Sequence, residues 1–297
     1  MKKAVWLAEA ILYLILSLPI AVLPRSLALR AGEMLGLFFF YFWKSRREVA
    51  LDNLEKSVAS RGIRISVPAQ TIIKENFRNL GRSLAEVIKI YYGLGGKIIE
   101  SVRMKGAENF EIAKSKGRGI LFISGHCGNW ELLAVTASAK LPGTAVIARP
   151  INNPYVNRLV ETLRKKYGNR VIYKKGALKP VIQTLKSNRG VGILMDQAVM
   201  KDEGYVIDFL GRGAWTSKVP AMIARKTGAA VLPVFIHRTD KGHEMEIYQE
   251  IALSRNGDRE LAVREDTIAF SRCIEQYIQK HPAEWLWIHR RWKRVRH

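Results

Sequence analysis

Between residues 119 and 195, short apolar blocks alternate with longer amphipathic stretches. The blocks have the length of strands and the stretches have helical spacing. The predicted strands are 119–124, 144–148, 170–173 and 191–195. One predicted helix begins at Asn129, and two others cover 154–167 and 178–187. Strand–helix–strand units of this kind place neighbouring strands parallel, with helices covering both faces. We therefore predict an α/β fold with a central, mostly parallel sheet flanked by helices.

The pattern continues toward the C-terminus and changes toward the N-terminus. We predict a helix at 217–227, strands at 230–236 and 244–248, and a long helix at 259–280. Apolar residues at three and four spacing predict another helix within 67–92. We expect an N-terminal helical, membrane-anchoring region at 1–100 and an α/β domain at 101–297. No internal repeat or low-complexity linker separates them.

The N-terminus is strongly apolar in two runs. Ala4–Pro24 is interrupted only by Glu9 and Ser17, and Met34–Trp43 reads MLGLFFFYFW. A removable signal peptide fits poorly because Glu9 lies in the apolar stretch and no clear cleavage site follows. Basic residues flank both runs, so neither side is clearly the positive one. We predict a membrane-associated helical segment, a pair of helices lying in or dipping into one leaflet. The first run is also long enough for a single span. A helical hairpin buried against the main domain is the alternative.

Charge and cysteine content restrict the partners and the compartment. The 297 residues include 49 Lys and Arg against 26 Asp and Glu, a net charge of +23. Such a field favours polyanions: nucleic acid, anionic lipid or an acidic carrier protein. Cys127 and Cys273 are too few for a disulfide framework, which indicates a reducing compartment.

One loop carries the strongest chemical signal. Ser124–Ala134 reads SGHCGNWELLA and follows a predicted buried strand, at the sheet edge where α/β proteins bind ligands. Gly125 and Gly128 allow a turn that would bring Glu131, in the first turn of the next helix, toward His126. A histidine oriented by a carboxylate is a general base for a hydroxyl.

Structural explanations exist for the same residues. Glu131 could merely stabilise the helix N-terminus, and His126 could be an ordinary loop residue. Cys127 could be a nucleophile, although a small buried filler is the better interpretation. His281 and His289 lack neighbouring ligands at metal spacing, so we predict no metal.

Several co-linear blocks resemble one family. Gly-His-x-Gly-Asn-Trp-Glu resembles the His-x-x-x-x-Asp/Glu signature of lysophospholipid acyltransferases. The Gly-Asn-Trp residues between the His and the Glu are similar to those of the lipid A biosynthesis late acyltransferases. Further similar blocks are Ala148–Pro150 with Asn152–Pro154 and Arg164, Lys174–Leu178, Gly192–Gln197, Phe209–Gly211 with Ala214–Thr216, Thr227–Ala229 with Val231–Pro233, and Pro282–Lys293. Arg47–Leu54 and Asn79–Ser83 resemble its N-terminal segment, so the resemblance covers nearly the whole chain.

The resemblance implies an O-acyltransferase at the cytoplasmic face of the inner membrane. It would move a fatty acyl group from acyl carrier protein to a hydroxyl of a lipid A precursor, with His126 as base, Glu131 orienting it and no cofactor beyond the acyl thioester. Its implied partners are acyl carrier protein, anionic membrane lipid and a phosphorylated glycolipid acceptor. The predicted substrate-binding residues are Arg149, Asn129, Asn153, Arg164 and Asp196. Arg164 could instead be a solvated helix residue, and Asp196 could cap a turn.

Two other functions are compatible with parts of the sequence. An acyl-CoA-dependent acyltransferase of another glycolipid, such as a phosphatidylinositol mannoside, shares the Gly-Asn-Trp loop but usually has Asp where this chain has Glu131. A basic, membrane-tethered nucleic-acid-binding protein would give His126 no role, and its affinity would fall steeply with salt. No nucleic-acid motif is present, so we predict no nucleic-acid partner.

Overall fold

The computed structural model describes residues 2–168, 170–293 and 295, without the side chains of residues 163–166. Within these residues seven strands form one sheet in the order β1-β9-β8-β2-β5-β3-β4. The strands are β1 (Arg103–Lys105), β2 (Ile120–Ser124), β3 (Ala145–Ala148), β4 (Arg170–Tyr173), β5 (Gly190–Leu194), β8 (Ala230–Thr239) and β9 (Gly242–Ile247). Neighbouring strands pair in parallel except β8 and β9, which pair antiparallel. The predicted α/β fold with a mostly parallel sheet is confirmed.

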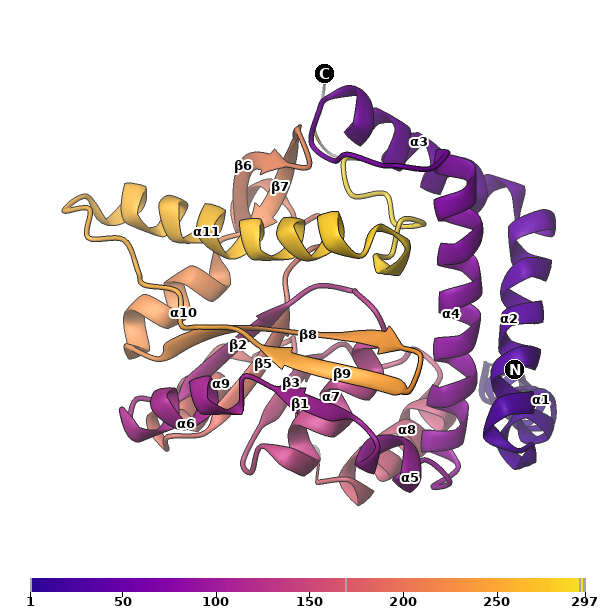
Figure 1. Cartoon of the computed structure of the whole chain (residues 1–297). Helices are drawn as coiled ribbons and strands as arrows, with labels where there is room; N and C mark the ends of the chain where they lie inside the picture. The colour runs from indigo at the N-terminus through magenta and orange to yellow at the C-terminus, as the bar shows by residue number, and fades with distance from the viewer. Residues whose placement is uncertain (1, 169, 294, 296–297) are drawn as a thin grey trace.

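Helices cover both faces because the central strand is apolar on both sides. Along β2, Ile120 and Phe122 pack into one buried cluster, and Leu121 and Ile123 pack into the other. The first cluster includes residues of α5 (Gly96–Glu100), α6 (Ala107–Ser115) and α7 (Trp130–Lys140), and the second includes residues of α9 (Leu178–Lys186), α10 (Val219–Thr227) and α11 (Arg259–Lys280). Figure 1 shows α11 above strands β8 and β9, with α7 and α8 (Pro154–Lys166) below them.

The N-terminal helices stand at the end of the sheet toward which β8 points (Figure 1). They are α1 (Lys2–Val22), α2 (Arg25–Phe42), α3 (Lys44–Ala59) and α4 (Ala69–Tyr91). Glycines let α2 and α4 approach closely, because a Cβ on Gly36 would lie 2.1 Å from the Phe77 carbonyl oxygen, and one on Gly81 would lie 2.0 Å from that of Gly32. The second buried cluster includes Phe40, Leu54 and Phe77 beside residues of the sheet, so this core continues across residue 100. The division into two domains at residue 100 stays a prediction.

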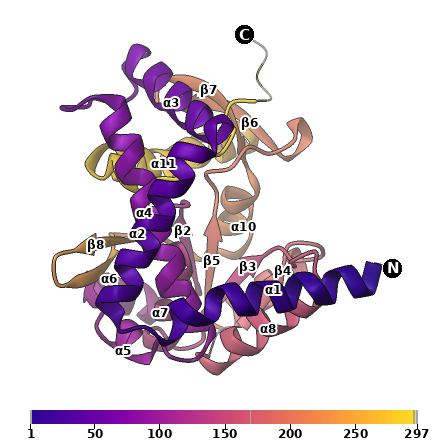
Figure 2. The ribbon, with the colours of Figure 1, turned by 90° about the vertical axis from the view of Figure 1, so that its right-hand side faces the viewer.

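Helix α1 extends along α8 with its N-terminal end at the periphery (Figure 2). It is long and apolar enough to cross a membrane, judged by length and composition alone. Its side chains are largely exposed, with Leu12, Ile15 and Leu16 between 55% and 66% accessible. Helix α1 is therefore not buried against the main domain, whereas α2 packs closely on α4, and membrane association stays a prediction.

Some elements were absent from the sequence-based prediction. These are β1, α3, α5, α6, the antiparallel hairpin of β6 (Gly204–Phe209) and β7 (Arg212–Ser217), and the short 3₁₀ turns η1 (Lys201–Glu203) and η2 (Pro282–Glu284). The predicted strands and helices lie within a few residues of the observed ones, and the helix at 259–280 has the predicted bounds. The turn η2 begins a C-terminal segment, whose Trp285 forms an isolated antiparallel bridge with Cys127.

Candidate active site

The register of β2 and β5 brings His126 and Asp196 together. Ser124 is the register partner of Leu194, and each strand ends at that residue. Two residues farther along each chain segment are His126 and Asp196, so both leave the sheet at the same edge. The His126 Nδ1 lies 2.7 Å from Asp196 Oδ1, and the His126 backbone N–H donates to Asp196 Oδ2 at 2.9 Å. The structure therefore contains a His–Asp pair whose members are 70 residues apart in the chain.

Asp196 is a buried anion held by several donors. Only 2% of its surface is exposed, and the Trp285 indole N–H donates to Oδ2 at 2.8 Å. Burial alone would raise the pKa of Asp196, but the charge and hydrogen bond of His126, its backbone N–H and the Trp285 indole together hold that pKa well below the usual range. Asp196 is therefore an ionised carboxylate that accepts three hydrogen bonds from the protein.

His126 has one ring nitrogen committed and one facing the site. Asp196 accepts the Nδ1–H, which leaves the Nε2 lone pair as the basic group. Burial works to lower the pKa of His126, but the charge and hydrogen bond of Asp196 and the charge of Glu131 outweigh it and raise that pKa above 6.5. Nε2 lies 3.2 Å from the Gln197 side-chain nitrogen, and the ring packs edge-on against Trp130. Asp196 thus fixes the orientation of the ring, and Nε2 is the nitrogen that can accept a proton.

The loop after β2 is shaped by backbone contacts that require glycine. Gly128 has φ +55°, and a Cβ there would lie 1.9 Å from the Ile236 carbonyl oxygen. Its N–H donates to the Glu284 carbonyl at 2.9 Å, and the Leu286 N–H donates to the His126 carbonyl at 3.1 Å. The C-terminal segment therefore holds this loop in place from one side.

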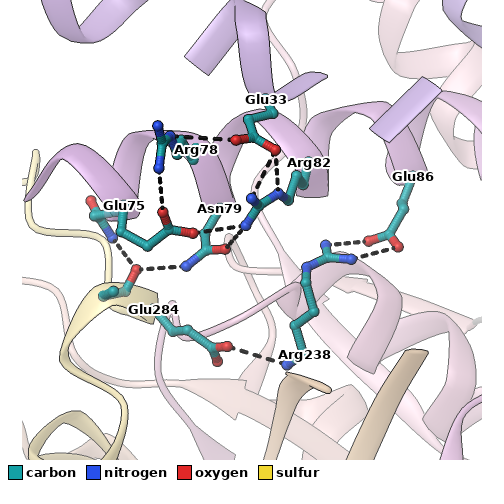
Figure 3. A network of polar contacts seen from close by, with 10 residues as sticks. Glu33, Glu75, Arg78, Asn79, Arg82, Glu86, Arg238 and Glu284 are labelled. Carbon is teal, nitrogen blue, oxygen red and sulfur yellow. Dashed lines mark hydrogen bonds and ion pairs between the residues drawn. The ribbon is translucent and has the colours of Figure 1, made fainter. Parts of the chain in front are cut away.

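A charged network supports the loop from the α4 side. Glu86 on α4 is 1% exposed and accepts both terminal nitrogens of Arg238, at 3.0 and 2.8 Å (Figure 3). It also accepts the Asn129 side-chain amide at 3.0 Å. Burial works to raise the pKa of Glu86, but hydrogen bonds and charges from His243 and Arg238 lower it to about 2. Arg238 also donates its backbone N–H to Glu284 at 3.2 Å, which joins α4, β8 and the C-terminal segment around the loop.

Glu131 does not occupy the predicted position beside the ring. It lies in the first turn of α7, as expected, but its carboxylate accepts the Tyr91 hydroxyl at 2.9 Å. The ring nitrogens of His126 instead meet Asp196 and Gln197. The printed hydrogen bond to the ring comes from Asp196, which the parallel register supplies, and the role of Glu131 in orienting the ring stays a prediction. The charge of Glu131 still acts on His126 by raising its pKa.

Three predicted substrate-binding residues have structural contacts instead. Asp196 is enclosed by donors, as described above. Asn129 is 3% exposed; its oxygen accepts the Leu132 N–H and caps α7, while its amide donates to Glu86. Asn153 caps α8 and donates to the Trp6 carbonyl and to Glu9, which ties α1 to the body. These three side chains therefore have structural hydrogen bonds within the protein, and their role in binding substrate stays a prediction.

The remaining predicted residues are placed as follows. Arg149 is exposed just beyond β3, and its substrate role stays a prediction. Arg164 belongs to α8, but its side chain lies outside the described residues. Cys127 is 1% exposed, and burial raises the pKa of its thiol well above the usual value, as expected for a buried filler.

An apolar cavity opens beside the loop. It leaves about 660 Å³ free of atoms, including its mouth. Its lining comes from α7, the loop that follows it, and strands β2, β3, β5 and β8: Phe122, Ser124, Trp130, Glu131, Leu133, Ala134, Ala137, Leu141, Thr144, Val146, Ile147, Ala148, Gly192, Ile193, Leu194 and Val234. Trp130, which contacts His126, and Glu131 lie in this lining. The base is therefore next to a slot that suits a hydrocarbon chain.

Two residues of the site received no role from the sequence. Trp285 and Gln197 both stand in blocks that resemble the family, but only the fold places them against Asp196 and His126. Among the described residues, no group of three or more His, Cys, Asp or Glu side chains is arranged to hold a metal ion.

The chain is similar in sequence to known bacterial acyltransferases. A family model described as bacterial lipid A biosynthesis acyltransferase matches residues 2–294. The chain is 25% identical over 291 residues to the lipid A biosynthesis palmitoleoyltransferase of Escherichia coli strain K12, covering 97% of this chain and 90% of the relative. The lipid A biosynthesis myristoyltransferase of that strain is 22% identical over 256 residues, covering 86% and 77%. A phosphatidylinositol mannoside acyltransferase of Mycolicibacterium smegmatis is 25% identical over 226 residues, covering 74% and 72%.

Proposed function

The chain belongs to the bacterial lipid A biosynthesis acyltransferase family, and on that premise we propose which acyl transfer it performs. The donor is a fatty acyl thioester of acyl carrier protein. The acceptor is a hydroxyl on a 3-hydroxyacyl chain of a lipid A precursor. The observation that carries the proposal is the His126–Asp196 pair beside an apolar cavity, since a held base next to a hydrocarbon slot suits transfer of an acyl chain to a hydroxyl.

The proposed chemistry follows from the two ring nitrogens. Nε2 of His126 removes the acceptor hydroxyl proton while the oxygen attacks the thioester carbonyl carbon. Ionised Asp196 stabilises the imidazolium that forms, as a buried carboxylate does in a Ser-His-Asp triad. When the tetrahedral intermediate collapses, the C–S bond breaks, and the imidazolium returns the proton to the departing thiolate. In this mechanism Asp196 takes the orienting role, and Glu131 contributes charge at the cavity rim.

The cavity supports a fatty acyl group as the transferred unit. Its lining residues Trp130 and Leu141, at the start of α7 and just after its end, are eleven positions apart, which at about 1.5 Å per position spans about 16 Å. An extended hydrocarbon advances about 1.3 Å per carbon, given C–C bonds of about 1.5 Å. The apolar lining along α7 is therefore long enough to contact about 12 carbons of an extended chain.

Exposed charge at the same sheet edge supports acidic donor and acceptor partners. Arg149 follows β3, and Lys174 and Lys175 follow β4; all three are exposed. With a net charge of +23, the protein attracts acyl carrier protein, anionic membrane lipid and the phosphates of a glycolipid acceptor. The proposal requires no cofactor beyond the acyl thioester and no nucleic acid.

The arrangement of α1 supports an in-plane membrane position at the cytoplasmic leaflet of the inner membrane. Asn153 binds the N-terminal half of α1, and the Ser17 hydroxyl lies 3.0 Å from the Tyr92 hydroxyl. Lys89 donates to the Ala21 and Leu23 carbonyls at the other end. A helix attached along its length to α4 and α8 lies along the protein, and its exposed apolar side chains face outward to lipid.

The test is mass spectrometry of lipid A from a strain of the source organism that lacks the gene. We expect a precursor one acyl chain short, corrected by the wild-type gene and by His281→Ala but not by His126→Ala. The matched variant removes a histidine at the end of α11 whose ring stacks on His237. Unchanged lipid A in the deletion strain, with no redundant enzyme, rejects this acceptor. A missing acyl chain on another glycolipid would support the alternative favoured by the mycobacterial relative.

A further inference from the structure

Gln197 occupies the nitrogen of His126 that the proposed mechanism uses. Its side-chain nitrogen lies 3.2 Å from His126 Nε2. Because Asp196 accepts the Nδ1–H, a neutral His126 presents only a lone pair at Nε2. The partner must then be a donor, and the Gln197 amide NH₂ supplies one. In the free protein the basic lone pair is therefore already hydrogen-bonded.

The acceptor hydroxyl needs the same place. A general base must lie about 2.6–3.2 Å from the atom whose proton it removes. The Gln197 amide nitrogen stands at that distance from Nε2, so hydroxyl and amide compete for one lone pair. The amide must move aside before proton transfer begins.

Gln197 is built to move without disturbing the His–Asp pair. The Met195 N–H donates to the Ser124 carbonyl at 3.1 Å, which continues the β2–β5 pairing, and the next residue, Asp196, is fixed by its own hydrogen bonds. Gln197 itself is only partly buried, and its side-chain nitrogen has the His126 ring as its hydrogen-bond partner. Rotation of this side chain frees Nε2 and leaves Asp196 and the ring in place.

Water could also donate a hydrogen bond to an unoccupied His126 Nε2 and be activated by it. If the base activated water while an acyl thioester was bound, the water oxygen would attack the carbonyl, the C–S bond would break, and fatty acid and thiol would leave. A glycolipid hydroxyl arrives with the binding energy of a large molecule, whereas a water molecule does not. The hydrogen bond from the Gln197 amide to His126 Nε2 therefore opposes water more effectively than it opposes the bound acceptor hydroxyl.

We propose that the Gln197 amide stays hydrogen-bonded to His126 Nε2 until an acceptor hydroxyl displaces the amide. This hydrogen bond limits hydrolysis of the bound acyl thioester. This inference rests on the proposed function. One neutral hydrogen bond accounts for about a fivefold suppression of hydrolysis. The residue acts on the reacting nitrogen itself.

The experiment uses the full-length protein in detergent micelles with acyl carrier protein carrying a fatty acyl thioester. Thiol release without acceptor measures hydrolysis, and acylated lipid A precursor measures transfer. We expect Gln197→Ala to raise the ratio of hydrolysis to transfer about fivefold. The matched control is Gln183→Ala, which removes an exposed glutamine from α9 and should leave the ratio unchanged.

A second measurement is independent of turnover. A donor on Nε2 competes with protonation, so removing it should raise the pKa of His126, followed by NMR of histidine labelled in the ring. Gln197→Glu, which replaces the donor with a carboxylate, should raise that pKa further. An unchanged hydrolysis ratio, or an unchanged pKa in Gln197→Ala, overturns the inference. If wild-type protein transfers no acyl group, the proposed function fails, and the NMR titration alone decides whether Gln197 occupies the base.

Discussion

His126 stands between two carboxylates that differ in almost every physical respect. On one side, Asp196 is buried, accepts three donors and has a strongly lowered pKa. On the other, Glu131 lines the cavity in the first turn of α7 and accepts the Tyr91 hydroxyl. Asp196 is distant in the chain and bonded to the ring, whereas Glu131 is near in the chain and acts on the ring through its charge. Distance along the sequence is therefore a poor guide to which carboxylate orients a base.

The largest expected effect comes from Asp196→Asn. It preserves the shape of the side chain but removes the charge that stabilises the imidazolium, so acyl transfer should fall about a thousandfold. The pH dependence should change as well. In the proposed mechanism His126 acts in its neutral form, and Asp196 raises the pKa of His126 above its usual value, so wild-type transfer should decline as pH falls through that raised pKa. Without Asp196, burial dominates, and the decline should move to lower pH in initial rates measured across pH.

Glu131→Gln provides the direct comparison. It removes a charge that raises the pKa of His126 but no hydrogen bond to its ring, so transfer should fall only about tenfold. The acid limb of the pH profile should shift downward by less than in Asp196→Asn. If Glu131→Gln instead loses as much rate as Asp196→Asn, the ranking is reversed and Glu131 is the orienting carboxylate of the working enzyme.

Trp285→Phe tests how the Asp196 side is held. It deletes the indole donor to Asp196 while keeping an aromatic ring, and transfer should fall about tenfold because a hydrogen bond to a charged group is lost. Trp287→Phe is the control, because Trp287 packs edge-on against Trp285 and donates to the Pro282 carbonyl, not to Asp196. Both variants should lower the melting temperature similarly. Equal losses of transfer in the two would show that the indole acts through packing alone.

Tyr91→Phe should have the smallest effect. It removes the hydroxyl that donates to Glu131 and leaves the His126–Asp196 pair intact. We expect transfer to fall only about twofold to threefold, since a single partly buried hydrogen bond is lost. Kinetics with acyl chains of different length would detect a change at the cavity rim, and a loss larger than that of Glu131→Gln would contradict this ranking.

Regular patterning made most of the sheet predictable. β2 and β5 are apolar blocks of strand length, and amphipathic helices separate the predicted strands. Other elements lack such a signal. β1 has three exposed residues, and the β6–β7 hairpin joins segments without the strand-and-helix alternation. Short or exposed strands are stabilised by the neighbours they find in the fold, which a local pattern does not contain.

The amino-acid sequence by itself determined the α/β class, the mostly parallel sheet and the loop that carries His126, because periodicity and turn residues are local properties. The partner of that histidine was decided by tertiary structure. Ser124 aligns with Leu194 only when β2 and β5 pair, and that register alone sets Asp196 beside His126. The C-terminal segment then brings Trp285 to the same carboxylate. Contacts between residues 70 and 89 positions apart depend on strand register and chain crossing, which spacing along the sequence does not encode.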